Sequence, residues 1–570
     1  MQRERTSIYW SRLRLTFVLA AVAAVGLVAE AQVAPDGGSI LRQEPPSVLD
    51  LHREPVPAVQ AQQAPPAPLQ APHDLRFVLR GWRITGQTAF TESELLALVQ
   101  DLVGNEVAIG LADLEEAAAR ISRHYRERGY VVARAYIPAQ EIRDGVVEIA
   151  VLEGHIGRVI VENRSRVRDG IIASRVEGLQ DRLVRADEID LRLRRTYELA
   201  GIGAGQPAAL HPGTNVGETD LVLPLESEPF LTGSVSLDNH GNRFTGGNRV
   251  SAQINMHSPT HSGDLLALRG TLGDPDLAIY DILYELPAGA SGLRFGGDVS
   301  RVRYELGRDF SALEAHGTAD TWLAFVSHPL ALGRTHATHA RLSYRESDIQ
   351  DRIDSTGTVT DKSSAVSTFA ITGDWHDALA RGATAVSVSF SRGDLNIRSA
   401  DARAIDEATA RTQGSFSKWN VNLTRLQRLT ERASLYLDYA GQKAQSNLDS
   451  SEKFFLGGPY GIKGYPEGEA PGDTGHILTA ELRYGLGSIR IPGRTQLFTF
   501  VDTGQVTANA NPYAAGSNRR RLRSAGVGLD WAGARELHVR ALLAQPLGTH
   551  AATSDTDRPT RAWLQAFKRF

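Results

Sequence analysis

Apolar and polar residues alternate with a period of two from Phe230 to the end of the chain. Two early segments place Leu231, Gly233, Val235 and Leu237, and then Val250, Ala252, Ile254 and Met256, on one face opposite polar residues. Segments at 278–286, 435–439 and 525–531 repeat the pattern, with Gly, Asn, Asp and Ser between segments. One apolar and one polar face is typical of strands that have lipid outside and water inside.

The length of this region favours a barrel over a soluble sandwich, whose strands can also alternate. Residues 229–570 number 342, and sixteen strands of about 9 to 11 residues, with turns and loops, would use about 21 residues each. We therefore predict one antiparallel transmembrane β-barrel of sixteen strands. The chain stops at Phe570 in a strand-like segment, a familiar outer-membrane assembly signal, although Lys568 stands where a second apolar residue is expected.

The region before Phe230 mixes helical periodicity with short strands. In residues 76–154 a capping box opens a helix at Thr91, a second helix starts at Leu111 and stops at Gly129, and a hairpin follows. Residues 155–228 repeat the order of strand, two helices, turn and strand. The predicted fold class is therefore mainly β, with two α+β modules of the βααββ type before the barrel.

The N-terminus has the pattern of a targeting segment. Four arginines precede an apolar run over residues 15–29, and Ala29-Glu30-Ala31 resembles a cleavage site, so residues 1–31 are predicted to be a signal peptide. A retained anchor is the weaker alternative, because the run is short for a membrane-spanning helix. Residues 32–75 contain a Pro-rich linker, in which residues 36–44 could form one or two helical turns before Pro45 and Pro46.

Composition narrows the chemistry. The chain has no cysteine, which excludes thiol catalysis, disulfides and Cys-ligated metal sites. The formal charge is −4, or −6 once the four Arg and two Glu of residues 1–31 are removed, so nothing points to a nucleic-acid partner. There is no Gly-Lys dipeptide and hence no nucleotide-binding P-loop, and no Gly-x-Ser-x-Gly elbow occurs. We predict a protein without cofactor, metal or enzymatic activity.

Several motifs together carry a resemblance to a known family. The first module contains Arg128-Gly129-Tyr130-Val131 and Gly145-Val146-Val147-Glu148-Ile149, and the second contains Leu210-His211-Pro212-Gly213 and Gly217-Glu218-Thr219-Asp220-Leu221. The most specific stretch is Phe455-Leu456-Gly457-Gly458-Pro459-Tyr460-Gly461-Ile462-Lys463-Gly464-Tyr465. In these motifs and their order the mature chain resembles the two-partner secretion transporters of the ShlB, FhaC and HecB type.

The resemblance implies a division of the chain and a candidate site. It implies a plug segment with linker at 32–75, polypeptide-transport-associated (POTRA) domains at 76–154 and 155–228, and a barrel at 229–570. The translocation-loop motif comprises Gly457, Gly458, Ile462, Lys463, Gly464 and Tyr465. Its counterpart on the barrel wall comprises Phe500, Asp502 and Gly504, which share one face of a strand.

The candidate pair Lys463 and Asp502 departs from the family pattern, in which the loop residue is arginine. Arginine can hold a carboxylate with a bidentate fork, whereas lysine is a flexible point charge. We therefore expect a looser or differently shared contact between Lys463 and Asp502. The alternative interpretation is that both residues are ordinary solvated charges on a loop and on the wall of the lumen.

Two other patterns are set aside. Asp-Thr-Gly, the triplet of aspartic proteases, occurs at 473–475 and 502–504, but 29 residues between the copies are too few for two protease lobes. His336 and His339 are three apart in a strand-like region, so they would face opposite sides and could not hold one ion.

The resemblance implies a monomeric pore in the outer membrane with its POTRA domains in the periplasm. Such a pore recognises a large exoprotein of the hemolysin, adhesin or toxin type through that partner's N-terminal secretion domain and exports it to the cell surface. Outer-membrane lipid is the other expected partner. An insertase of the same superfamily is the nearest alternative, and a passive porin or adhesive barrel is the alternative from another class.

Overall fold

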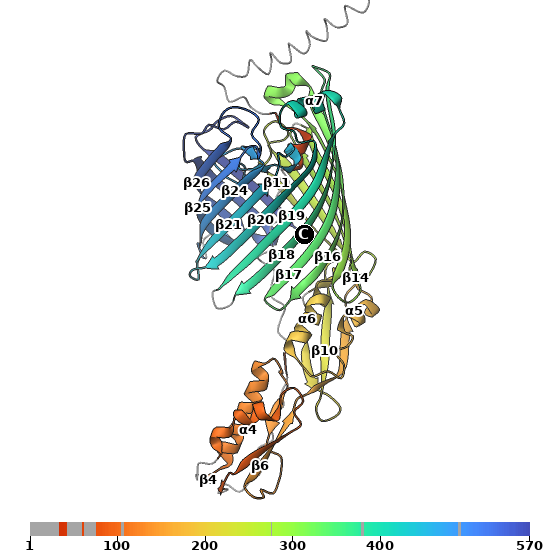
Figure 1. Cartoon of the computed structure of the whole chain (residues 1–570), viewed down its shortest axis with the longest axis vertical. Coiled ribbons are helices and arrows are strands. Elements are labelled where there is room, and N and C mark those ends of the chain that lie inside the picture. The colour runs from red at the N-terminus through yellow and green to blue at the C-terminus, as the bar shows by residue number, and fades with distance from the viewer. Residues whose placement is uncertain are drawn as a thin grey trace, which may run out of the picture.

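A closed β-barrel forms the largest part of the protein (Figure 1). The computed structural model describes residues 34–42, 60–61, 76–103, 108–203, 205–274, 276–377, 381–487 and 492–570. The predicted signal peptide, residues 1–31, lies outside these residues, as does most of the predicted linker. In the described part of the chain, no helix has the length and apolar character needed to cross a membrane.

Sixteen strands in the described residues close the barrel in chain order, each antiparallel to the next, which confirms the predicted fold class. The strands are β11 (Leu231–Asp238), β12 (Arg249–His257), β13 (Leu265–Gly273), β14 (Asp276–Ala288), β15 (Leu293–Glu305), β16 (Ala315–Leu332), β17 (His336–Ile353), β18 (Thr358–Asp377), β19 (Gly382–Ile397), β20 (Gly414–Arg428), β21 (Ala433–Ala444), β24 (Thr474–Gly485), β25 (Arg494–Thr507), β26 (Arg519–Ala532), β27 (Leu537–Pro546) and β28 (Arg561–Arg569).

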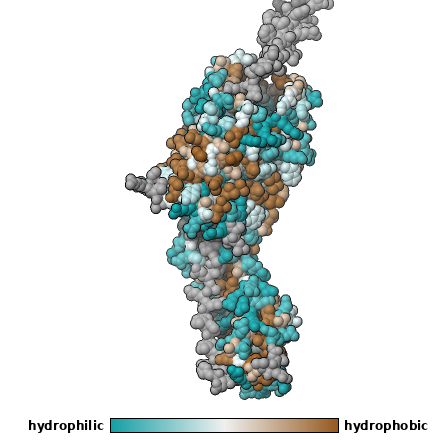
Figure 2. Space-filling view, turned by 90° about the vertical axis from the view of Figure 1, so that its left-hand side faces the viewer, coloured by the Kyte–Doolittle hydropathy of each residue, from teal (hydrophilic) through white to brown (hydrophobic). Residues whose placement is uncertain are grey.

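The alternation of the sequence appears in the barrel as alternating burial. On β25, for example, Leu497 and Val501 are exposed whereas Phe498 and Phe500 are buried. The exposed apolar side chains of neighbouring strands form a hydrophobic area on the face of the barrel wall that Figure 2 shows. This is the arrangement that a lipid-facing outer surface and a polar interior require.

The strands differ in length, and the barrel closes between two of the shortest. Strands β16, β17 and β18 have 18, 18 and 20 residues, whereas β11 has 8 and β28 has 9. The closing pair runs from Ser234 opposite Arg569 to Asp238 opposite Gln565. The backbone of Phe570 adds two hydrogen bonds to Gly233, of 2.9 and 3.0 Å. The C-terminal residue is thus part of the seam.

The first POTRA-like module packs helices on a three-stranded sheet of order β3-β6-β5. Its elements are β2 (Phe77–Val78), β3 (Gly81–Thr85), α3 (Glu92–Ala97), η2 (Gln100–Leu102), β4 (Ala108–Ile109), α4 (Leu111–Glu127), β5 (Arg134–Tyr136) and β6 (Val146–Leu152). Thr91 caps α3 as predicted, and Gly129, with φ +91°, follows the end of α4. The positive φ explains why glycine stands at this stop.

The second module lies between the first module and the barrel (Figure 1). Its elements are β7 (His155–Asn163), α5 (Asp169–Val176), α6 (Ala186–Tyr197), β8 (Ile202–Gly203), β9 (Ala209–Pro212) and β10 (Glu218–Ser227). A strand from the linker, β1 (Gln60–Ala61), pairs in parallel with β9. The module also contacts the barrel, because the backbone of Glu198 accepts a hydrogen bond from Arg294 on β15.

Candidate functional site

Residues 445–473, which connect β21 to β24, form an inner loop that packs against the inside of the barrel. The loop contains η4 (Ser450–Glu452), β22 (Phe454–Phe455) and β23 (Pro471–Gly472). Leu456, Ile462 and Tyr465 at its tip are fully or almost fully buried, and they form a cluster with Val506 and Leu522 of the wall. Apolar packing therefore fixes a loop that begins and ends at the barrel rim.

Lys463 and Asp502, the two charges paired from sequence, meet inside the barrel. Nζ of Lys463 lies 2.9 Å from Oδ1 of Asp502, and the backbone amide of Lys463 donates to Oδ2 at 3.1 Å. Thr479 and Ser524 donate to the same carboxylate at 2.9 and 2.7 Å. Asp502 is 0% exposed and Lys463 is 5% exposed, so neither charge is solvated. The alternative interpretation of two solvated charges is wrong.

The lysine also has secondary partners. Its Nζ lies 3.8 Å from Glu481 and 4.6 Å from the ring centre of Phe500, which gives a cation–π contact. The expected looser contact is not found, since 2.9 Å is an ordinary charge-assisted hydrogen bond. The expected sharing is present, because one ammonium serves two carboxylates and a ring.

Glycines allow the loop to approach the wall closely. A Cβ on Gly464 would lie 2.8 Å from the backbone nitrogen of Pro546 and 2.8 Å from Cβ of Ser524. A Cβ on Gly504 would meet Leu456 and Ile462 of the loop at 3.0 and 3.1 Å. Both contacts are shorter than ordinary van der Waals distances, so the glycines of the two motifs are required by packing.

The remaining motif residues support the same contact. Gly457 forms a backbone bridge with Ile462, Gly458 donates its amide to the carbonyl of Tyr465 at 3.2 Å, and the Tyr465 hydroxyl donates to the carbonyl of His550 at 3.1 Å. Trp563 of β28 donates from its indole to the carbonyl of Lys463 at 2.8 Å. The structure thus brings together all nine residues of the two predicted motifs, and Trp563 is a contact that sequence reasoning missed.

The aspartates of both Asp-Thr-Gly triplets help to hold the inner loop, Asp473 as its last residue and Asp502 from the wall. Asp473, which is 0% exposed, pairs with Lys453 and accepts the backbone amides of Leu448 and Ala510 at 3.1 and 2.8 Å. Asp502 holds the tip through Lys463. Each carboxylate has its own lysine, an arrangement unlike two acids that share a proton. In the described residues, no cluster of three or more His, Asp or Glu has the geometry of a metal site.

A short helix from the N-terminal segment, α2 (Gly37–Leu41), lies inside the barrel near the end remote from the POTRA-like modules (Figure 1). Ile40 is 1% exposed and packs with Phe244, Tyr304 and Ile349. The amide of Gly37 donates to Asp351 of β17 at 2.9 Å, and the hydroxyl of Tyr304 donates to the same carboxylate at 2.6 Å. The predicted helical turns at 36–44 are confirmed over these residues.

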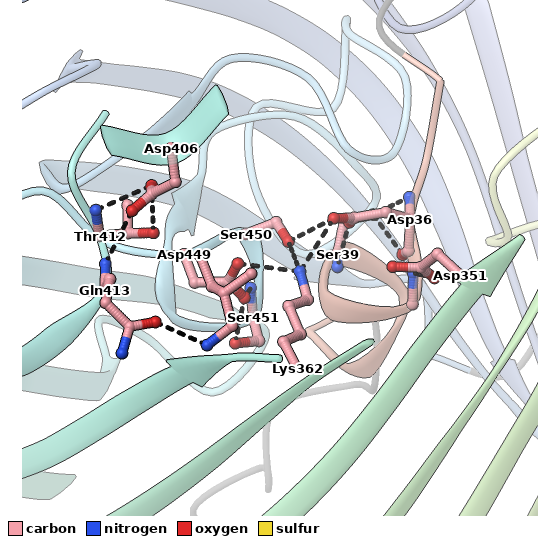
Figure 3. A network of polar contacts seen from close by, with 12 residues as sticks. Asp36, Ser39, Asp351, Lys362, Asp406, Thr412, Gln413, Asp449, Ser450 and Ser451 are labelled. Atoms are coloured by element: carbon pink, nitrogen blue, oxygen red, sulfur yellow. Dashed lines mark hydrogen bonds and ion pairs between the residues drawn. The ribbon is translucent and has the colours of Figure 1, made fainter. Parts of the chain in front are cut away.

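Asp36, the N-cap of α2, connects the helix to both the wall and the inner loop (Figure 3). Its Oδ2 accepts from the Ser450 hydroxyl at 2.6 Å and lies 3.4 Å from Nζ of Lys362 on β18. The same Nζ lies 2.8 Å from Asp449 of the loop. One buried lysine therefore joins the N-cap of α2, the wall and the base of the loop. Little in the sequence points to this cluster, because a lysine at a lumen-facing strand position is ordinary.

A second buried cluster holds the base of the inner loop. Glu452 of η4 is 2% exposed and pairs with Lys418 at 2.7 Å and with Arg345. Between α2, the loop and the wall remains a cavity of 460 Å³, whose lining includes Arg42, Glu452, Tyr460 and Glu467. The lumen is thus occupied by two segments that apolar packing and polar contacts hold together, with the 460 Å³ cavity left between them.

A closed sixteen-stranded barrel with an inward-folded loop, an inserted helix and modules at one mouth defines the class of outer-membrane β-barrels with POTRA modules. A family model described as haemolysin secretion/activation protein ShlB/FhaC/HecB matches residues 217–531, and the model of the ShlB-type POTRA domain matches residues 77–154. The chain belongs to the ShlB/FhaC/HecB family of two-partner secretion transporters. Its barrel therefore lies in the outer membrane, and its POTRA region lies in the periplasm.

Individual relatives agree with this assignment. The heme/hemopexin transporter protein HuxB of Haemophilus influenzae strain 86-028NP is 28% identical over 582 residues, which cover 100% of both chains. The outer membrane transporter CdiB of Escherichia coli O6:K15:H31 is 22% identical over 444 residues, covering 76% of this chain and 74% of that protein. The solved structure of CdiB from Escherichia coli has the same fold, with a TM-score of 0.71 at 19% identity, covering 95% of this chain and 100% of that one.

Proposed function

We propose that this chain recognises one large secreted protein in the periplasm and passes it in extended form through the barrel to the cell surface. The observation that carries the proposal is the filling of the lumen by α2 and the inner loop. Both are held in part by ion pairs and hydrogen bonds that water or a passing chain can replace. A passive porin has no use for such removable segments.

The POTRA modules are the proposed capture site. In the described part of the chain, β3 and β5 are the edges of the first sheet, and β7 is an edge of the second. An open edge presents unpaired amides and carbonyls, to which an extended segment of the partner can add as a strand. The opposite edge of the second sheet, at β9, is covered by β1, so capture there would require release of the linker.

The pair Lys463 and Asp502 is the proposed latch of the inner loop. Its support is the burial of both charges and the four hydrogen bonds that Asp502 accepts, two of them from Lys463. In this proposal residues 76–154 and 155–228 act as capture modules, residues 229–570 act as the pore, and the segment 32–75 provides plug and linker. Folding of the partner outside the cell would give direction to transport, since the sequence has no P-loop for nucleotide.

The pore is proposed to act as a monomer, without catalysis or cofactor. The barrel is closed by strands of one chain, so a second copy is not needed to complete the wall. The relatives HuxB and CdiB are transporters. Because HuxB aligns over its full length, an exoprotein of the type that serves heme or hemopexin uptake is the first partner to test.

The test is secretion of a large partner encoded beside this chain, in cells that carry the intact protein or a variant without residues 76–228. Heat-modifiable migration in gels would first establish that both barrels assemble. We expect the partner in the medium only with the intact chain. Equal secretion from both cells, or from cells that lack the chain altogether, would contradict the proposal.

Insertion of other barrels into the membrane is a second candidate function, and the short seam favours it. The closing strands β11 and β28 pair over five residues, from Ser234 to Asp238, whereas β17 and β18 pair from His336 to Ile353. A short seam costs less to open for strand exchange. The discriminating measurement is the amount of other outer-membrane barrels in cells that lack this chain, which the secretion proposal expects to be unchanged.

A further inference from the structure

Three arginines on β26 face outward from the barrel. Arg519, Arg521 and Arg523 are exposed, whereas the intervening Leu522 and the next residue, Ser524, are buried. Arg520 lies on the inner side, where it pairs with Glu469 of the inner loop at 2.6 Å. Because successive side chains of a strand point to opposite faces, the three alternate arginines form one row on the outer wall.

The row lies at the outer-leaflet end of the membrane. β11 leaves the second POTRA module at Leu231, so its end at Asp238 is remote from the periplasm. Antiparallel pairing then places Arg561 of β28, Pro546 of β27 and Arg519 of β26 at that same end. The outward arginines thus stand where the apolar band meets the headgroups of the outer leaflet.

The row has no acidic partner in the part of the chain that the structure describes. Opposite it on β25 stand Thr507, Gln505 and Thr503, and the guanidinium of Arg521 donates to Gln505 at 2.9 Å. Two other exposed arginines toward this end of the barrel do have carboxylates: Arg301 pairs with Asp320 at 3.3 Å, and Arg398 pairs with Asp348 at 2.7 Å. The positive charge of β26 is therefore local and uncompensated.

A shallow apolar groove lies below the row on the same side of the barrel. It has a volume of 760 Å³, and its lining includes Leu482, Leu497, Val527, Ala541, Leu543 and Ala562 of strands β24 to β28. Figure 2 shows this side of the molecule, with hydrophobic residues gathered across the barrel wall. Val527 follows Arg523 by four residues, which separates them by about 13 Å along the strand. The small side chains of Ala541 and Ala562 form the floor of the groove, and the larger apolar side chains around them form its sides.

We propose that this face binds a phosphorylated glycolipid of the outer leaflet, of the lipid A type. Its phosphate groups contact Arg519, Arg521 and Arg523, and an acyl chain fills the groove below. The guanidinium group presents planar paired donors to phosphate oxygens, and the apolar groove gives an acyl chain more contact than a convex wall. The distance of about 13 Å between Arg523 and Val527 would allow the headgroup of one lipid to contact the arginines while its acyl chain lies in the groove, within the hydrocarbon layer.

The test is a titration of the purified full-length protein in detergent with bisphosphorylated lipid A, followed by native mass spectrometry. The test variant is the triple substitution Arg519→Gln, Arg521→Gln and Arg523→Gln. The control variant is Arg301→Gln, Arg303→Gln and Arg392→Gln, which removes three exposed arginines from β15 and β19. We expect the test variant to bind lipid A at least tenfold more weakly and the control variant to bind as the unchanged protein does.

A second variant examines the groove with the arginines intact. Ala541→Phe places a ring from the outer face into the groove, and we expect it to weaken lipid A binding by at least threefold without affecting barrel assembly. Dephosphorylated lipid A should bind the unchanged protein at least tenfold more weakly than the bisphosphorylated form. The proposal is overturned if the triple test variant binds like the control variant, or if phosphatidylglycerol binds as tightly as lipid A, which would indicate general attraction of anionic lipid. If the triple variant does not assemble, the single variants Arg519→Gln and Arg523→Gln carry the same comparison.

Discussion

The ammonium group of Lys463 and the carboxylate of Asp502 form a 2.9 Å contact across 39 residues of sequence, with both side chains buried. The backbone amide of the same lysine reaches the second carboxylate oxygen at 3.1 Å. One aspartate therefore fixes both the side chain and the backbone of the loop tip. This double contact does not depend on the bidentate fork of an arginine.

Removal of the charge at Asp502 should release the loop tip. In Asp502→Asn the buried ammonium of Lys463 loses its nearest counter-charge, and breaking a buried pair from one side costs about 3 to 5 kcal/mol. We expect proteolysis of the inner loop to be at least tenfold faster. Lys463→Arg is the matched control, because it keeps the charge and should retain most of the protection of the loop. Equal loss in both variants would show that the contact depends on shape alone.

Lys362 should control how tightly the resting pore is closed. Lys362→Gln removes the cation shared by Asp36 and Asp449, and it leaves these two carboxylates near each other without compensation. We expect a several-fold rise in the mean conductance of single pores in planar bilayers, because α2 would leave the lumen more often. Lys443→Gln, at an exposed position of β21, should leave the conductance unchanged. Identical recordings from the two variants would rule out a role for Lys362 in closure.

Gly464→Ala tests the close approach of the loop tip to the wall. The new methyl group would lie 2.8 Å from the backbone of Pro546 and from Cβ of Ser524. Neither neighbour can turn away as a long side chain would, so we expect destabilisation of the docked loop by about 1 to 3 kcal/mol. Hydrogen exchange of residues 456–465 should rise while exchange in the barrel strands does not. Unchanged protection of residues 456–465 from hydrogen exchange would mean that the barrel wall shifts to make room for the methyl group.

Glu153 makes the first POTRA module sensitive to acid. Burial by itself raises the pKa of this carboxyl, but hydrogen bonds from the amide of Ala89, from Thr88 and from the Tyr125 hydroxyl outweigh burial and lower the pKa below its usual value. Because the pKa of Glu153 is lower in the folded module than in the unfolded chain, ionised Glu153 stabilises the module. This stabilisation is complete above the ordinary glutamate pKa of about 4.3. It is lost as the pH falls through the lower folded value.

The expected result is loss of amide protection at Thr88 and Ala89 in acid, measured by hydrogen exchange on the full chain. Glu153→Gln should remove about 1.5 to 3 kcal/mol of module stability at neutral pH, because it takes away the charged acceptor. The variant should also lose most of the acid dependence as the pH falls below the ordinary glutamate pKa. Tyr125→Phe deletes only the 2.6 Å hydrogen bond from the Tyr125 hydroxyl to Glu153, so it should lower the stability of the module by less than Glu153→Gln does.

Much of the fold can be predicted from periodicity, because a period of two over more than 300 residues is hard to satisfy with any architecture except a large closed sheet. The helix beginning after Thr91 and the stop at Gly129 can be predicted because caps and positive φ leave local marks in sequence. The pair Lys463 and Asp502 can be predicted only through the motifs around it. The short distance between the two side chains cannot be predicted. The chemistry of lysine suggests a loose contact, whereas the distance depends on the four donors around Asp502, which the sequence does not reveal.

The plug contacts cannot be predicted from the sequence. Asp36 is 326 residues from Lys362 and 414 residues from Ser450, and no local pattern connects positions so far apart. On its strand Lys362 has the spacing of any lumen-facing polar residue. The arginines of β26 form a basic run in the sequence, but their outward direction follows only from the inward contacts of Arg520 and Ser524.

Asp36 contacts Ser450, and Ser450 belongs to the loop whose tip Asp502 holds, so the two obstructions of the lumen are not independent. A mutation that eases passage of the exported protein by weakening one of them also weakens the other. The outer membrane protects the cell by excluding antibiotics and bile salts, and a pore wide enough for a polypeptide would admit both. Selection for faster export is therefore opposed by selection for a tight permeability barrier. Both act on the residues around Lys362, because this lysine contacts both segments.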